Sequence, residues 1–128
     1  MKQINIKPFV NSYLATAAWV TCDSGECNTF TAEAIRTATS DCQKFIDKVF
    51  AEFSIADAER ILNLAGNELS HIAAHDFFLT RNRHGAGFWD KEDIYGEMEA
   101  KKLTEISHEM KETDCYHIRG KKSKLSFS

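Results

Sequence analysis

The sequence predicts a predominantly helical α+β fold, namely a single-domain helical bundle over residues 1–128 with a small C-terminal β-hairpin. Three observations support this prediction. Apolar residues recur at helical spacing along most of the chain, alternating residues appear near its end, and no internal repeat or low-complexity tract is present. A length of 128 residues with 43% hydrophobic and 27% charged residues is typical of one globular domain.

A first helix is expected in the stretch PFVNSYLATAAWV, because apolar residues recur there on one helical face: Phe9, Tyr13, Ala17 and Val20. Pro8 suits the first turn of this helix, since the N–H group that proline lacks has no partner there. The segment TCDSGECN that follows contains Gly25 and small polar residues, which predicts a loop.

The clearest helical stripe comes next: Ile35, Ala38, Cys42, Phe45, Ile46, Val49, Phe50 and Phe53. Thr31 is placed to cap the beginning of this helix. Ser54 is the expected N-cap of a further amphipathic helix, with Asp57 three residues later as in a capping box. Cys42, on the stripe, is expected to be a small core residue.

The last helix is expected from about Tyr95 to Met110, where apolar residues alternate with Glu and Lys. Beyond it, residues 115–119 and 125–127 alternate in side-chain character on either side of a Gly-Lys-Lys sequence. This pattern predicts a hairpin.

The charge balance narrows the classes of partner. A net charge of −3 and a pI near 5.9 argue against a general nucleic-acid-binding surface, although the run from Arg119 to Lys124 carries four positive charges. No stretch approaches the ~20 apolar residues of a membrane span, and the first ten residues lack the apolar region of a secretory signal. We therefore expect a cytoplasmic protein with reduced cysteines and no membrane association.

The segment HDFFLTRNRHGAGFWD, residues 75–90, is the richest in functional groups. Its two glycines are expected to end a helix at Gly85 and to turn the chain sharply, so that Phe88 and Trp89 return to the core. The polar residues just before the turn are expected at the surface as candidate partner-binding residues: Arg81, Asn82, Arg83 and His84. The remaining residues of the motif have expected structural roles, with each aspartate able to anchor an arginine: His75, Asp76, Gly85, Gly87, Phe88, Trp89 and Asp90.

Evidence for a metal site or a catalytic centre is weak. His71 and His75 have the spacing of helical zinc ligands, but alanines stand between them where metalloproteases carry a glutamate. Cys22 and Cys27 are separated more widely than the cysteines of a zinc knuckle or a redox motif. No cofactor, metal or catalytic residue is assigned on this basis.

The block AAHDFFLTRNRHGAGFWD, residues 73–90, closely resembles the signature of a family of small bacteriophage-encoded proteins of unknown function. The resemblance extends over about residues 9–118, whereas the basic tail departs from relatives that look acidic and glycine-rich. The motif positions carried over are His75, Asp76, Leu79, Thr80, Arg81, Asn82, His84, Gly85, Gly87, Phe88, Trp89 and Asp90. The resemblance implies no activity, but it implies expression in the cytoplasm of an infected bacterium.

Three functions follow from these observations. The leading hypothesis is a non-enzymatic phage accessory protein that binds a host macromolecule through residues 81–84, for example to inhibit a host defence enzyme or a nucleic-acid enzyme. The alternative is a nucleic-acid-associated module that uses Arg81, Arg83 and the basic tail. The third hypothesis is a metal- or phosphate-handling enzyme centred on five motif residues: His75, Asp76, Arg81, His84 and Asp90.

Overall fold

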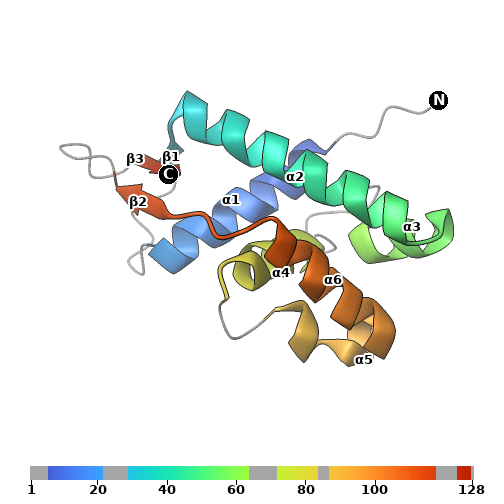
Figure 1. The fold of residues 1–128 in the computed structure, drawn as a ribbon. Helices are drawn as coiled ribbons and strands as arrows, with labels where there is room; N and C mark the ends of the chain where they lie inside the picture. Colours follow the sequence, from blue (N-terminus) through green and yellow to red (C-terminus); the bar gives the residue numbers. More distant parts are fainter. Residues whose placement is uncertain (1–5, 22–28, 64–71, 84–86, 118–123, 128) are drawn as a thin grey trace.

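The computed structural model describes residues 6–21, 29–63, 72–83, 87–117 and 124–127. Across these ranges the chain forms, in order, α1 (Lys7–Thr21), β1 (Thr29–Phe30), α2 (Ala32–Glu52), α3 (Ile55–Leu62), α4 (Ile72–Arg81), the 3₁₀ helix η2 (Phe88–Asp90), α5 (Glu92–Tyr95), α6 (Glu97–Glu109), β2 (Cys115–His117) and β3 (Lys124–Phe127). The predicted predominantly helical α+β fold is confirmed (Figure 1). None of the described helices combines the length and apolar character that crossing a bilayer requires.

The predicted caps of α2 and α3 are confirmed. The Thr31 hydroxyl accepts a hydrogen bond from the Ala34 N–H at 3.0 Å, and the Ser54 hydroxyl accepts one from the Asp57 N–H at 3.2 Å. Each bond satisfies an amide that has no partner within its own helix. The two caps therefore fix where α2 and α3 begin.

Stacked phenylalanines form the centre of the core. The Phe45 ring of α2 lies 4.1 Å from the Phe77 ring of α4 and 5.8 Å from the Phe88 ring of η2, measured between centroids. Phe9 of α1 also stacks with Phe45, at 6.2 Å between centroids. Cys42 is fully buried, as predicted. These rings join four elements around one apolar centre.

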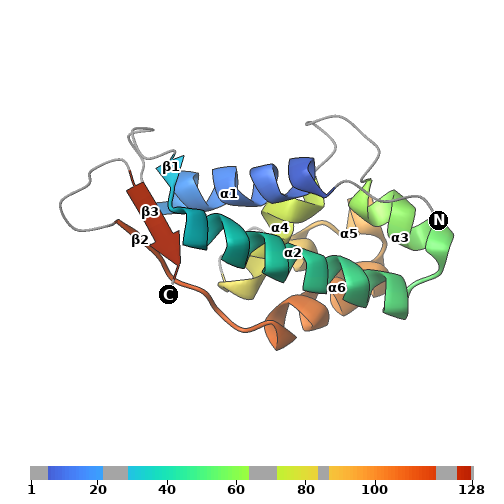
Figure 2. The same ribbon diagram turned by 90° about the horizontal axis from the view of Figure 1, so that it is seen from above.

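Helix α4 lies at the middle of the fold, where it packs against α1, α3, α6 and η2 (Figures 1 and 2). Because helices surround it on several sides, nearly every residue from Ala73 to Arg81 is buried, and His75 is partly exposed. Polar side chains of α4 must therefore find partners inside the protein.

The segment after η2 is divided differently from the prediction. Gly96, with φ of 107°, ends α5 and precedes α6, so Tyr95 belongs to α5 and the long helix starts at Glu97. A φ in this region favours glycine. A Cβ at Gly96 would also lie 2.4 Å from Oε1 of Glu99. The break between the two helices therefore depends on this glycine.

The strands form a three-stranded sheet at the end of the helical body opposite α3 (Figures 1 and 2). Strands β2 and β3 are antiparallel, with Tyr116 opposite Ser126, which confirms the predicted hairpin. Strand β1 pairs in parallel with the other edge of β3, with Phe30 opposite Leu125. The prediction missed β1, because a two-residue strand carries no periodic signal.

Candidate functional site

Among the described residues of the segment 73–90, Arg81 makes the most side-chain hydrogen bonds, and it lies inside the protein. Its side chain is 4% exposed, and Nη1 donates to Oδ2 of Asp41 at 2.8 Å and to the Tyr13 hydroxyl at 3.0 Å. Nε and Nη2 donate to the backbone carbonyls of Lys111, at 2.8 Å, and Met110, at 3.1 Å. The prediction that Arg81 lies at the surface is therefore wrong, because its guanidinium group is buried and donates to acceptors within the protein.

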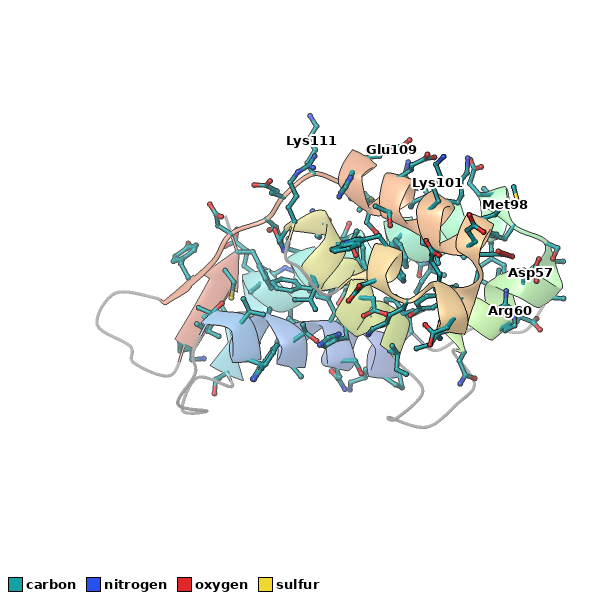
Figure 3. All side chains as sticks on the ribbon, turned by 90° about the horizontal axis from the view of Figure 1, so that it is seen from below. Asp57, Arg60, Met98, Lys101, Glu109 and Lys111 are labelled. Carbon is teal, nitrogen blue, oxygen red and sulfur yellow. The ribbon has the colours of Figure 1, made fainter. Side chains whose placement is uncertain are left out.

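Of the two carbonyls that Arg81 binds, that of Met110 belongs to the C-cap of α6, where the last carbonyls of a helix lack partners, and that of Lys111 belongs to the next residue. A cation at this position also interacts favourably with the helix dipole. Lys111 has φ of 65°, the left-handed conformation common just after helices, and its own side chain extends away from the body (Figure 3). Arg81 thus joins the end of α4 to the end of α6 and, through Asp41, to α2.

Asn82 and Arg83 differ in how much they are available to a partner. The Asn82 side chain donates to the Phe78 carbonyl at 3.0 Å and accepts from the Thr113 N–H at 2.8 Å, so it ties α4 to the segment after α6. Arg83 is 63% exposed and lies 3.4 Å from Glu112. It has φ of 59°, so the left-handed residue after α4 is Arg83. Predicted residues His84 and Gly85 lie outside the described residues.

Asp76 is fully buried on α4, and three side chains bind its carboxylate. Oδ1 accepts from Lys91 Nζ at 2.6 Å and lies 3.3 Å from His75 Nδ1, while Oδ2 accepts from the Tyr95 hydroxyl at 2.6 Å. We call these four residues the Asp76 cluster. Asp76 was expected to anchor an arginine; it anchors a lysine and a tyrosine. Lys91 follows η2 directly and Tyr95 is the last residue of α5, so their bonds to Asp76 attach η2 and α5 to α4.

The Asp76 cluster also presents His75 at the surface. Its imidazole is 38% exposed and lies 6.3 Å, between ring centroids, from the indole of Trp19 on α1. A histidine held by a buried carboxylate is the arrangement that orients a general base in hydrolases. Here the carboxylate also binds Lys91 and Tyr95, which makes it the centre of a structural cluster. Within the described ranges, no three His, Cys, Asp or Glu side chains are placed to hold a metal ion. His71 lies outside these ranges.

The turn after α4 brings Gly87 against Thr80. A Cβ at Gly87 would lie 2.1 Å from Oγ1 of Thr80, the same oxygen that accepts the Phe88 N–H at 3.0 Å. Phe88 is fully buried, as predicted, but Trp89 is 51% exposed and Asp90 is also exposed. The prediction that both rings return to the core is therefore wrong for Trp89, since successive residues of a tight helical turn point in different directions.

We expect Gly87→Ala to lower the free energy of unfolding by about 1–3 kcal/mol, because the new methyl group displaces the Thr80 hydroxyl. Urea denaturation measures this change. The double variant Thr80→Ala/Gly87→Ala lacks the 2.1 Å contact with the hydroxyl and keeps only the one at 3.2 Å with the Cβ of residue 80, so the summed effect of the single variants should exceed that of the pair. Strict additivity would contradict the proposed contact.

Among the described residues, burial raises the pKa of four groups, the hydroxyls of Tyr13 and Tyr95 and the thiols of Cys42 and Cys115. For Tyr95 the nearby Asp76 carboxylate contributes as well, since it opposes a second negative charge and binds the protonated hydroxyl. Each group therefore keeps its proton in the folded protein at a pH where the unfolded chain releases it.

The free energy of unfolding should consequently be constant near neutral pH and fall as the pH rises above about 9, first through Cys42 and Cys115 and then, above about 10, through the tyrosines. Each group adds a slope of about 1.4 kcal/mol per pH unit. Urea denaturation at a series of pH values measures this slope. Cys42→Ala should flatten it between pH 9 and 10, and a stability that stays constant up to pH 11 would contradict the assignment.

Four residues that contact Arg81, Asp76 or His75 were missed in the sequence analysis: Asp41, Lys91, Tyr95 and Trp19. Asp41 and Lys91 resemble ordinary surface charges, because the elements that bring them to Arg81 and Asp76 are distant in sequence. A scan for unpaired charges within a mostly apolar helix would have marked Asp76 and Arg81 as needing partners. Comparisons with protein-family models, with curated proteins and with solved structures gave no significant match.

Proposed function

We propose that this chain is a small, non-enzymatic bacteriophage accessory protein that binds a host protein in the bacterial cytoplasm. The observation that carries the proposal is the exposure of both tryptophans, 65% for Trp19 and 51% for Trp89. Tryptophan is among the residues most enriched at the energetic centres of protein interfaces. The phage context comes from the resemblance of residues 73–90.

Both indoles project from elements that the core holds firmly. Trp19 lies on α1 beside His75, whose imidazole is bound to Asp76. Trp89 lies on η2 between buried Phe88 and Lys91, which is bound to the same carboxylate. A rigid, exposed aromatic side chain loses little conformational entropy on binding. We define the contact surface as two parts, Trp19 with His75 and Trp89 with Lys91, with Arg83 nearby in sequence.

The charges near this surface favour a protein over a nucleic acid as the partner. Lys91 neutralises Asp76 within the cluster, Arg81 is buried against Asp41, and Arg83 faces Glu112. Phosphate recognition uses cations that are available to the ligand. The two tryptophans of the contact surface are therefore the side chains best suited to bind a partner, and they fit apolar pockets on a protein.

The experiment uses the purified chain as bait in a lysate of the bacterial host, followed by reconstitution with the captured protein. We expect a stoichiometric partner whose affinity falls about 30-fold or more in Trp19→Ala or Trp89→Ala, since truncating an interface centre costs about 2 kcal/mol or more. The matched control is Ile55→Ala, which removes an apolar side chain of 69% exposure from α3.

Two results would contradict the proposal. One is the absence of any stoichiometric partner, and the other is an equal loss of affinity in Ile55→Ala. Titration of labelled single- and double-stranded DNA at low salt belongs to the same experiment. Binding of DNA that weakens steeply with salt, and that needs Arg83, would favour the nucleic-acid function instead.

A further inference from the structure

A cavity of about 280 Å³, open to solvent, lies between the end of α1, the end of α4 and residues 112–115. Val20, next to Trp19, and Phe78, one turn after His75, form its apolar part. Asn82 lies one turn further along the same face of α4. The cavity is therefore lined by α1 and α4, the helices that carry Trp19 and His75.

The rim of the cavity is acidic. Glu112 and Asp114 line it, and both are exposed. No third ligand for a metal ion accompanies them in the part of the chain that the structure describes. The accessible lining is mainly polar, with Val20 and Phe78 as its smaller apolar part. The ligand that suits two exposed carboxylates beside these side chains is an organic cation with a short aliphatic stem.

The size of the cavity limits this ligand to about one side chain. Sites for drug-sized molecules usually measure about 300–1,000 Å³, so a volume of about 280 Å³ lies at the lower limit. An arginine side chain has the required form, with an apolar stem for Val20 and Phe78 and a planar fork of donors for the carboxylates.

The protein already pairs a guanidinium group with this rim, since Arg83 Nε lies 3.4 Å from Glu112 Oε1. Both side chains are more than 60% exposed, and such pairs contribute little to stability. We propose that the cavity receives an arginine side chain of the protein partner, which displaces Arg83 from Glu112. This inference rests on the proposed function and identifies the chemistry of the partner's contact.

The test needs no partner protein. Butylguanidinium serves as the probe for the arginine side chain, and N-butylurea is its neutral counterpart of the same shape. Chemical shifts of backbone amides are followed during titration of the ¹⁵N-labelled chain. We expect saturable shifts at Asn82, Thr113 and Cys115 with butylguanidinium and none with N-butylurea.

Three variants sharpen the test. Glu112→Gln/Asp114→Asn should weaken the probe at least fivefold, whereas the matched control Asp57→Asn/Glu59→Gln, on α3 at the far end of the molecule, should leave it unchanged (Figure 3). Arg83→Ala should tighten the probe about twofold or more, because the competing guanidinium is gone. A role of Glu112 and Asp114 in folding alone predicts no such gain.

The inference fails if the shifts are linear in probe concentration, equal for the neutral compound, or insensitive to Glu112→Gln/Asp114→Asn. It also fails if Arg83→Ala weakens the probe. These results leave the tryptophan-dependent capture of a host protein untouched. Conversely, saturable probe binding without any captured partner would refute the proposed function and leave the cation site standing.

Discussion

Replacing Arg81 with methionine is expected to lower the free energy of unfolding by about 3–5 kcal/mol, the usual effect of removing one partner from a buried ion pair. The substitution leaves the Asp41 carboxylate, which is 19% exposed, without its cation. The carbonyls of Met110 and Lys111 lose their donors at the same time. Urea denaturation measures the loss, and methionine keeps the side-chain volume, so the loss reports on polar contacts.

Arg83→Met is the matched control for this variant, because it makes the same substitution two residues away at an exposed position. Its effect should stay within about 0.5 kcal/mol. Arg81→Lys should recover only part of the stability, since an ammonium group cannot reach four acceptors with the geometry of a planar fork. If Arg81→Met and Arg83→Met had the same effect, Arg81 would not join α2, α4 and α6.

The second large effect is expected for Asp76→Asn, which should cost about 3 kcal/mol because it leaves the Lys91 ammonium without its carboxylate. The amide can still accept one hydrogen bond, from Lys91 or from Tyr95. Since both residues follow η2, the loss should concentrate in η2 and α5. Hydrogen exchange of the amides of residues 88–95 should therefore accelerate more than that of α2.

Asp90→Asn removes the same charge from an exposed position of η2 and serves as the control. Its effect on stability should stay within about 0.5 kcal/mol. Uniform acceleration of exchange throughout the protein in Asp76→Asn would show global destabilisation. That result would contradict the specific attachment of η2 and α5 to α4.

The parts of the fold that the sequence predicted are those governed by local interactions. Thr31 and Ser54 cap the helices that follow them because a side-chain oxygen needs to reach an amide only three residues ahead. The long stripe that includes Cys42 and Phe45 recurs at helical spacing because one face of α2 is buried. Such signals are contained within a window of a few turns.

The direction in which Arg81 points could not be predicted in this way. A helix with one buried face reveals by its pattern where each residue points, but α4 is buried on nearly all sides. A charged residue on such a helix gives no sign of whether it faces solvent or a partner. The deciding partners, Asp41 and Lys111, are 40 and 30 residues away in the sequence.

The candidate site was predicted only in part, because some of its contacts are local and others join residues that are distant in sequence. Residues 75–90 were correctly predicted to contain structurally important residues, since Asp76, Gly87 and Phe88 all make defined contacts. The exposure of Trp89 depends on the short 3₁₀ turn that η2 makes, and the sequence pattern gives no indication of its orientation. The partner-binding role of Asn82 and Arg83 stays a prediction.

The order of the strands has a consequence for protein synthesis. Strand β3 is the middle strand but the last of the three in sequence, and Thr31 and Ser126, whose hydroxyls meet across the sheet, are 95 residues apart. At a translation rate of about 5–20 residues per second, the ribosome needs roughly 5–20 s to supply the missing strand. During that interval β1 has been synthesised and its partner β3 has not. Strand β1 therefore cannot pair with β3 until the intervening chain, including α2 to α6, has been made.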